Sequence, residues 1–214
     1  MNQSQFQKAA GISAELAARW YPHITAAMKE SGITTPLAQA MFIAQCGHES
    51  TGFSRLVESF NYSIAGLANF VKAKRLTQDQ ANSLGRRQSE PSLPLQRQRA
   101  IANLVYSKRM GNNAAGDGWL YRGRGIIQVT GLNNYRTCGD ALTVDLVAQP
   151  ELLAQDNYAA RSAAWFFVTN GCLKWGGDLE RVTQIINGGQ NGIDDRRARF
   201  LKAKSVLVWG SDGD

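Results

Sequence analysis

Hydrophobic residues recur every three or four positions along most of this chain, a spacing typical of helices that bury one face. The clearest stripe carries Leu37, Met41, Ala44 and His48, and it ends beside Glu49. Glycines and N-capping residues at the ends of the periodic segments indicate where helices begin and end. We therefore predict helices over residues 13–31, 37–49, 63–76, 77–85, 94–110, 150–170, 178–187 and 194–208. Pro22 is expected to reset the first of these, and Thr35 and Pro36 are expected to start the second as its N-cap and first helical residue. The chain is expected to be mainly α-helical.

One stretch departs from this pattern, because residues 111–131 contain six glycines, too many for a helix. Within it, the sequence IIQVT alternates and is rich in β-branched side chains, which predicts a short strand or β-hairpin near residues 126–130. A long glycine-rich insert in a helical domain more often binds a ligand than simply connects two helices. We expect this loop to contribute to a binding site.

Length and composition favour a single globular domain: the chain has 214 residues, of which 43% are hydrophobic and 19% charged. No apolar run approaches the length that spans a bilayer, so no stable membrane insertion is expected. The first residues lack the basic start and apolar stretch of a signal peptide, which predicts a protein made in the cytoplasm.

The charge balance is basic, with 24 Lys and Arg residues against 17 acidic residues, a net charge of +7 and a pI near 9.5. Such a charge favours an anionic polymer as partner, whether nucleic acid, an acidic membrane surface or a bacterial wall. The basic residues are scattered along the chain, so an ordinary solvated surface explains them equally well.

Candidate chemistry begins with Glu49 and Glu58, two carboxylates placed nine residues apart on either side of a Thr51-Gly52 break. An uninterrupted helix would put them on opposite faces, separated by a rise of roughly 13 Å. A break lets the chain turn back so that the carboxylates face each other across a groove, as in glycosidases. Two solvated surface acids would show the same spacing.

Three motifs occur in a fixed order: GHES followed by a second glutamate, then YRGRGIIQVTGLNNY, then IINGG followed by DRRARF. In these motifs the chain resembles glycoside hydrolase family 19, from the first helix to Arg199, and it is most similar to the compact branch found in bacteriophage endolysins. The middle motif is the most specific, since a G-R-G-x-I-Q-x-[ST] run followed by N-Y is rarely seen elsewhere.

The resemblance implies a mainly helical, lysozyme-like fold with two lobes and the glycine-rich loop at a cleft between them. It implies a single catalytic domain over residues 1–214, with the smaller lobe within about 60–110 and no separate wall-binding domain. It also implies an inverting mechanism, in which one carboxylic acid protonates the leaving oxygen and a second carboxylate activates water. Glu49 matches the acid, Glu58 the base, and Thr130 the hydroxyl residue that holds the attacking water.

Further positions match residues that bind the substrate. Arg197 matches a basic residue that helps organise the carboxylates, with Arg199 as the rival position. Gln128, Asn134 and Asn187 match polar positions that bind the hydroxyl and acetamido groups of the sugar. Independently of the resemblance, a saccharide calls for aromatic platforms for its ring faces, and Trp119, Tyr121 and Tyr135 in or beside the glycine-rich loop are the candidates.

Three other functions fit parts of the sequence less well. A zinc amidase or peptidase of the cell wall would need more ligands than His23 and His48, because the His-Glu pair lacks a second histidine four residues on. A nucleic-acid-binding module would explain the charge but not the paired glutamates. A catalytically dead sugar-binding protein would have no use for Glu49, Glu58 and Thr130 together.

We therefore predict an endolysin-type glycoside hydrolase that cleaves β-1,4 glycosidic bonds of bacterial peptidoglycan and lyses the host cell, with chitinase as the near alternative. The enzyme is expected to be a monomer that acts on peptidoglycan glycan strands, binds no nucleic acid and needs no metal or organic cofactor. It is expected to stay in the host cytoplasm until a separate holin releases it to the periplasm and wall.

Overall fold

The computed structural model describes residues 1–211, and these residues form helices and loops with almost no β-structure, as predicted. Each of these helices is too short or too polar to cross a lipid bilayer. The α-helices are α1 (Gln3–Ala10), α2 (Ala14–Glu30), α3 (Pro36–Glu49), α4 (Ala68–Lys72), α5 (Gln78–Leu84), α6 (Leu95–Val105), α7 (Asp117–Leu120), α8 (Leu132–Leu142), α9 (Asp156–Thr169), α10 (Leu179–Asn187) and α11 (Ile193–Leu207). The 3-10 helices are η1 (Ala65–Leu67), η2 (Pro150–Ala154), η3 (Cys172–Trp175) and η4 (Trp209–Ser211).

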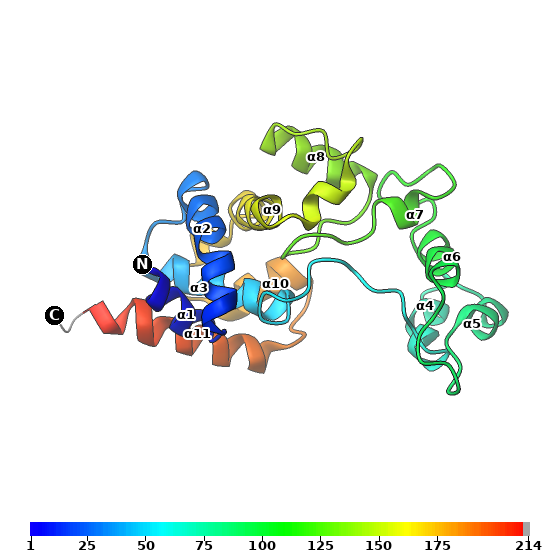
Figure 1. The fold of residues 1–214 in the computed structure, drawn as a ribbon, viewed down its shortest axis with the longest axis horizontal. Coiled ribbons are helices and arrows are strands. Elements are labelled where there is room, and N and C mark those ends of the chain that lie inside the picture. Colours follow the sequence, from blue (N-terminus) through cyan, green and yellow to red (C-terminus); the bar gives the residue numbers. More distant parts are fainter. Residues whose placement is uncertain (212–214) are drawn as a thin grey trace. The chain divides into compact units, whose positions relative to one another are not determined.

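The helices are divided between two compact units, each with its own hydrophobic core. Unit 1 comprises Met1–Leu56, Arg124–Gln128 and the chain from Glu151 onward. Unit 2 comprises Val57–Gly123 and Val129–Pro150. Helices α1–α3 and α9–α11 therefore belong to unit 1, and α4–α8 belong to unit 2 (Figure 1).

Helix α3 is central to unit 1, where α11 and α1 pack against it (Figure 1). All residues of α3 from Ala40 to Gly47 are buried, as expected for a helix that other elements surround. Thr35 caps its start by accepting a hydrogen bond from the Ala38 N–H at 3.3 Å. The predicted break after α3 is confirmed, because Thr51 and Gly52 have φ values of +52° and +69°.

Two helical features of unit 1 differ from the prediction. Helix α1 falls outside the predicted helices, although Asn2 and Gln5 form a capping box at its start and Phe6 is fully buried. Helix α2 continues through Pro22, where the sequence predicts that the helix is reset. Trp20, on the preceding turn, is fully buried, and this packing offsets the hydrogen bond that proline cannot donate.

The short strand or β-hairpin predicted near residues 126–130 is reduced to single β-bridge positions at Arg124 and Val129, because residues 125–128 adopt turns. Ile126 and Ile127 are both buried in the core of unit 1, with only 0% and 4% of their surface exposed. Consecutive residues of a strand point to opposite faces, so burying both isoleucines in one core favours a turn. Gly125 has a φ of +94° at the start of this turn, a value that glycine adopts without strain.

Unit 2 has a smaller core around the fully buried ring of Phe60. The rings of Tyr62, Tyr106 and Trp119 lie between 6.0 and 6.2 Å from it, measured between ring centroids. Helix α6 supplies the buried aliphatic side chains that complete this core. The helix predicted over residues 63–76 is realised as two short pieces, η1 and α4.

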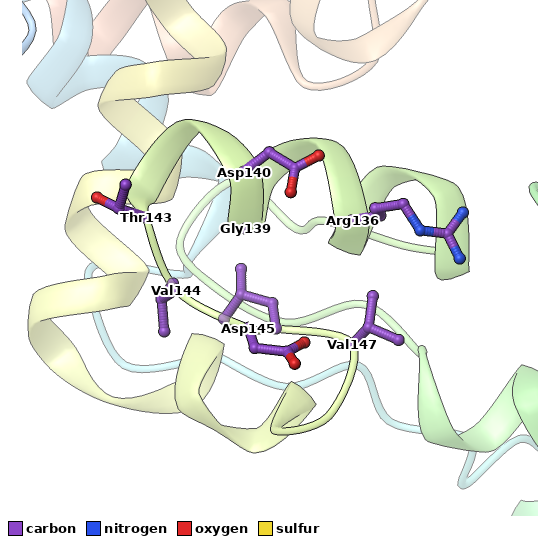
Figure 2. A pocket seen from close by; sticks show the side chains of 8 residues that line it. Arg136, Gly139, Asp140, Thr143, Val144, Asp145 and Val147 are labelled. Carbon is purple, nitrogen blue, oxygen red and sulfur yellow. The ribbon is translucent and has the colours of Figure 1, made fainter.

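Unit 2 also contains a hollow of about 570 Å³ between α8 and the segment 143–147 (Figure 2). Arg136, Asp140 and Asp145 lie along its edge, and none of the predicted catalytic or sugar-binding residues lines it. Segment 143–147 approaches α8 closely at Gly139, where a Cβ atom would lie 2.5 Å from the carbonyl oxygen of Val144.

Replacing Gly139 by alanine is expected to lower the free energy of unfolding by about 1–3 kcal/mol, because the new methyl group would collide with backbone atoms. Urea unfolding measures this loss. Gly177→Ala is the matched control, since its nearest neighbour would be a Leu37 methyl carbon at 3.6 Å, and its cost is expected to stay below about 0.5 kcal/mol. Equal losses in both variants would contradict the close approach at Gly139.

Candidate active site

Glu49 is the last residue of α3, and a buried arginine of α11 holds its carboxylate. Arg196 Nη2 donates a hydrogen bond to Glu49 Oε1 at 2.5 Å. The side chain of Arg196 is 1% exposed and that of Glu49 is 23% exposed, so the ion pair lies at the edge of the unit 1 core. A buried guanidinium without a charged partner would cost several kcal/mol, and Glu49 is that partner here.

The other two nitrogen atoms of the Arg196 guanidinium donate hydrogen bonds to uncharged oxygen atoms. Arg196 Nη1 donates to Gln45 Oε1, and Nε donates to the backbone oxygen of Asn191 at 3.1 Å. Gln45 is fully buried and in turn donates from Nε2 to Thr183 Oγ1 at 3.2 Å. This network joins α10, α3 and α11, and it sets the direction from which Arg196 meets Glu49.

The arginine that contacts Glu49 is not the one predicted from the sequence, which was Arg197 with Arg199 as the rival position. Arg197 forms an ion pair with Glu180 at 2.7 Å, and its side chain is 45% exposed. Arg199, the rival candidate, donates to Asp195 Oδ2 at 2.8 Å. Neither contacts Glu49 within the described chain, so the assignment moves to Arg196.

The spacing of buried residues along α11 excludes Arg197 as the arginine that enters the core. Arg196, Phe200, Ala203 and Leu207 recur every three or four residues, and all four are buried. Arg197 lies off this stripe, whereas Arg199, three residues after Arg196 and four before Ala203, lies at its edge with 27% of its side chain exposed. Burial therefore distinguishes Arg196 from Arg199.

Arg196→Leu is expected to lower the free energy of unfolding by about 3 kcal/mol, because Glu49 loses its charged partner and Gln45 loses the donor to its buried oxygen. Arg197→Leu, one position along, removes only an exposed pair and is expected to cost less than about 1 kcal/mol. Chemical denaturation compares the two variants directly. A larger loss for Arg197→Leu would mean that the Glu49 network adds no stability.

Glu58 lies in unit 2, and each of its carboxylate oxygens accepts a hydrogen bond. Tyr106 Oη donates to Oε1 at 2.8 Å, and the Gly123 N–H donates to Oε2 at 3.0 Å. Burial, and then the charge of Glu58, raises the pKa of the Tyr106 hydroxyl well above its usual value, so the hydroxyl remains a donor at neutral pH. Donors at both oxygens favour an ionised carboxylate, which a general base requires.

Tyr106→Phe is expected to slow hydrolysis by about 10- to 100-fold, because a hydrogen bond to a charged group contributes about 1.5–3 kcal/mol. The acidic limb of the kcat/KM profile is expected to move to higher pH, since the ionised form of Glu58 loses a donor. Tyr21→Phe is the control, because it removes a comparable part-buried bond to the Met1 carbonyl oxygen in unit 1. An acidic limb that stays in place in Tyr106→Phe would argue against Glu58 as the base.

The predicted site residues are distributed over both units. Asn134 Nδ2 donates to the Thr130 carbonyl oxygen at 2.7 Å, so these two residues lie together at the start of α8. Asn187 is exposed at the end of α10, where Gly188 closes the helix with a φ of +75°. Unit 1 contains Glu49, Gln128, Asn187 and Arg197, and unit 2 contains Glu58, Trp119, Tyr121, Thr130 and Asn134.

Two of the three predicted aromatic platforms, Tyr121 and Tyr135, are buried. Tyr121 is 5% exposed, donates from its hydroxyl to the Val147 carbonyl oxygen at 3.1 Å and packs on Tyr135 at a centroid distance of 5.3 Å. Neither ring therefore offers an open face, and the platform assignments of Tyr121 and Tyr135 are corrected. Trp119 is half-buried, and the guanidinium of Arg122 lies 3.7 Å from its ring centroid.

Neither histidine belongs to a group of metal ligands. His48 Nδ1 lies 2.7 Å from Asp195 Oδ2, and the ring of His23 packs edge-on against Trp20 at a centroid distance of 6.4 Å. Within residues 1–211, no three His, Cys, Asp or Glu side chains lie close enough together to hold a metal ion.

Known proteins similar to this chain include a family 19 glycosyl hydrolase and plant endochitinases. A family model described as chitinase class I matches residues 94–197, a segment that includes the glycine-rich loop and Arg196. A glycosyl hydrolase family 19 domain-containing protein of Haemophilus influenzae is 38% identical over 195 residues, which make up 90% of this chain and 90% of that protein. Endochitinase 3 of Solanum tuberosum is 45% identical over 125 residues, or 45% of this chain and 39% of that protein.

Solved structures share the fold at low sequence identity. Chitinase C from Streptomyces griseus HUT6037 has a TM-score of 0.59 and 19% identity, covering 96% of this chain and 76% of that chain. A bacterial family 19 chitinase has a TM-score of 0.60 and 20% identity, and the match covers 97% of this chain and 94% of that chain. The long match to the Haemophilus influenzae protein decides the family: the chain belongs to glycoside hydrolase family 19 and is a glycosidase with its mainly helical, lysozyme-like fold.

Proposed function

We propose that this glycosidase cleaves β-1,4 bonds of bacterial peptidoglycan by an inverting mechanism that uses two carboxylates. The observation that carries the proposal is that both glutamates are held by specific partners. Arg196 holds Glu49, and Tyr106 together with the Gly123 N–H holds Glu58. An inverting glycosidase needs two positioned carboxyl groups, one as acid and one as base, and the partners of Glu49 and Glu58 position both.

In this mechanism Glu49 protonates the leaving glycosidic oxygen. Its Oε1 accepts the hydrogen bond from Arg196, whereas no group of the described chain donates to Oε2. When Glu49 is protonated, its Oε1 can therefore still accept the hydrogen bond from Arg196 while its Oε2 carries the proton. After the proton has left, Arg196 stabilises the carboxylate that remains.

Glu58 removes a proton from the attacking water as the general base. Thr130 positions this water through its hydroxyl, while its backbone carbonyl is already engaged by Asn134. The Oδ1 atom of Asn134, together with Gln128 and Asn187, contacts the hydroxyl and acetamido groups of the sugar. These amide groups suit a neutral saccharide, because they pair with its donors and acceptors without adding charge.

Charge supports peptidoglycan as the substrate, since a protein with a net charge of +7 is attracted to an anionic wall. The nine-residue spacing of the two glutamates also resembles the compact endolysin branch. We further propose that the protein acts as a monomer, without a nucleic-acid partner. It stays in the host cytoplasm until a separate holin gives it access to the periplasm and wall, where its activity lyses the cell.

Chitin is the second candidate substrate, because relatives that match parts of the chain are named Chitinase 8 in Oryza sativa subsp. japonica and Endochitinase 3 in Solanum tuberosum. Chitin is an uncharged polymer of the same β-1,4 linkage. A basic surface would add little to the binding of chitin. Hydrolysis of peptidoglycan should therefore depend on salt concentration more strongly than hydrolysis of chitin.

Release of new reducing ends from purified peptidoglycan and from chitin oligomers, measured side by side at two salt concentrations, tests the substrate. We expect faster release from peptidoglycan, with an advantage that falls as salt rises. Faster release from chitin at both concentrations would replace peptidoglycan with chitin. A fall in wall turbidity without new reducing ends would mean that peptide or amide bonds are cut, and the proposed function would be wrong.

A further inference from the structure

The positive charge of the protein is concentrated in unit 2. This unit contains eleven of the Lys and Arg residues and six of the acidic residues, so it carries +5 of the net charge of +7. Unit 2 is also less than half of the chain. A small unit with this excess of cations attracts anions more strongly than the rest of the molecule does.

Within unit 2, the consecutive residues Arg86 and Arg87 line a pocket of about 480 Å³. Neither Arg86 nor Arg87 forms an ion pair in the described chain. The pocket contains no acidic residue, and its lining consists of Ser63, Ile64, Ala65, Arg86, Arg87 and Gln88.

Backbone hydrogen bonds build this pocket from two distant segments. The Arg86 N–H donates to the Tyr62 carbonyl oxygen at 2.9 Å, and the Ile64 N–H donates to the Arg86 carbonyl oxygen at 3.3 Å. Gly85 permits the contact, because a Cβ atom there would lie 2.7 Å from the Ile64 Cα. The two arginines are therefore presented on a paired backbone that fixes where their side chains begin.

The nearest acidic group already has partners of its own. Glu90 forms an ion pair with Arg97, and its Oε2 accepts a hydrogen bond from the Arg87 backbone N–H at 2.7 Å. Glu90 therefore forms its ion pair with Arg97 and attracts the charge of Arg87 only at longer range, and Arg86 donates from Nη1 to the Pro91 carbonyl oxygen at 3.4 Å without an ion pair. Arg86 Nε is also buried without a hydrogen-bond partner, so part of its charge is removed from water.

We propose that this pocket binds the phosphate group of a phosphorylated saccharide. Two guanidinium groups can engage a tetrahedral oxyanion with paired hydrogen bonds, a geometry that suits phosphate better than a single lysine does. Ser63 and Gln88 offer polar groups for sugar hydroxyls, and Ile64 and Ala65 supply an apolar wall. The volume suits a sugar with an attached phosphate, since ligand pockets occupy about 300–1,000 Å³.

The site is independent of the proposed carboxylate chemistry, because neither Glu49 nor Glu58 lines the pocket. The ligand chemistry is that of the phosphorylated glycans of a cell envelope. A phosphate site of this kind would hold the enzyme on such a polymer whichever glycosidic bond it cuts. The test therefore measures binding and does not use glycosidase activity.

The probes are glucose 6-phosphate, inorganic phosphate, acetate and glucose, each titrated into the 15N-labelled full chain at a constant ionic strength of about 0.15 M. Amide shifts of residues 62–66 and 85–88 report on the pocket. We expect saturable shifts with glucose 6-phosphate, weaker binding of inorganic phosphate, and no binding of glucose. No saturable shift with either phosphate probe, or equal binding of acetate, would overturn the proposal.

The double variant Arg86→Gln with Arg87→Gln is expected to weaken glucose 6-phosphate binding by about tenfold or more. Lys72→Gln with Arg109→Gln is the matched control, because both side chains are exposed in unit 2 outside the pocket and the charge change is the same. The control is expected to bind within about twofold of the parent. Equal weakening in both would assign the binding to the general charge of unit 2 and refute the site. Arg87→Gln alone, at an exposed position, gives the same decision if the double variant does not fold.

Discussion

Glu49→Gln is expected to lower kcat by about 10²- to 10⁴-fold, the range that a positioned general acid contributes. Glutamine has nearly the same shape and can offer its amide oxygen to Arg196, but it has no proton to give to a leaving oxygen. The substitution also removes the negative charge beside a buried arginine, so some stability is expected to be lost. Reducing-end release is therefore measured well below the melting temperature of the variant.

Glu180→Gln is the matched control for this result. Glu180 is an acidic residue of unit 1 whose side chain is 58% exposed and pairs with Arg197 at the surface. Its loss is expected to leave kcat within about twofold of the parent, since an exposed pair contributes little. If Glu49→Gln kept most of its activity while folded, Glu49 would not be the acid.

Glu58→Gln is expected to lower kcat by a similar factor of about 10²- to 10⁴-fold, but through the water and not through the leaving group. The amide cannot take a proton, and it no longer presents an ionised acceptor to Tyr106. Asp140→Asn, an exposed acidic position in the same unit, is the control and is expected to retain activity.

A change of leaving group separates the two roles. A nitrophenolate leaves without protonation, so an aryl glycoside of the substrate chain reduces the need for a general acid. We expect this substrate to restore a large part of the rate in Glu49→Gln and little of it in Glu58→Gln. The reverse pattern would exchange the acid and base assignments, and restoration in both variants would mean that neither residue activates water.

Local signals in the sequence were enough to predict the central helix. Thr35 and Pro36 start α3 as predicted, and the break after Glu49 is formed by residues with positive φ. Capping and helix breaking depend on neighbouring residues, so a single sequence contains the information. The same kind of signal was present for α1 in the Asn2–Gln5 capping box, but the segment was too short to show clear periodicity.

In the glycine-rich segment, the local sequence pattern predicts the wrong backbone conformation. Alternation and β-branching in residues 126–130 are properties of a strand, but a strand needs a partner to pair with. Here Ile126 and Ile127 are both buried in the core of unit 1, and this packing decides the conformation. Burial of Tyr121 against Tyr135 is likewise tertiary, and no spacing along the chain predicts it.

The groups that hydrogen-bond to the candidate site residues also differ in how far the sequence predicts them. The apolar stripe of α11 runs through Arg196, but Arg199 also fits its three- and four-residue spacing, so only burial in the fold decides between them. Tyr106 approaches Glu58 across 48 residues of chain, and Thr183 approaches Gln45 across 138, contacts that only the folded chain brings about. The motifs identify the candidate glutamates, whereas Tyr106 lies outside the motifs and is brought to Glu58 only by the fold.

The most direct test of the inverting mechanism is the anomeric configuration of the first product, followed by proton NMR as the wild-type protein hydrolyses β-1,4-linked chains of peptidoglycan or chitin. An inverting pair of carboxylates delivers water to the face opposite the leaving group, so the new reducing end must first appear as the α-anomer. Initial accumulation of the β-anomer would mean a retaining mechanism and would contradict the roles given to Glu49 and Glu58.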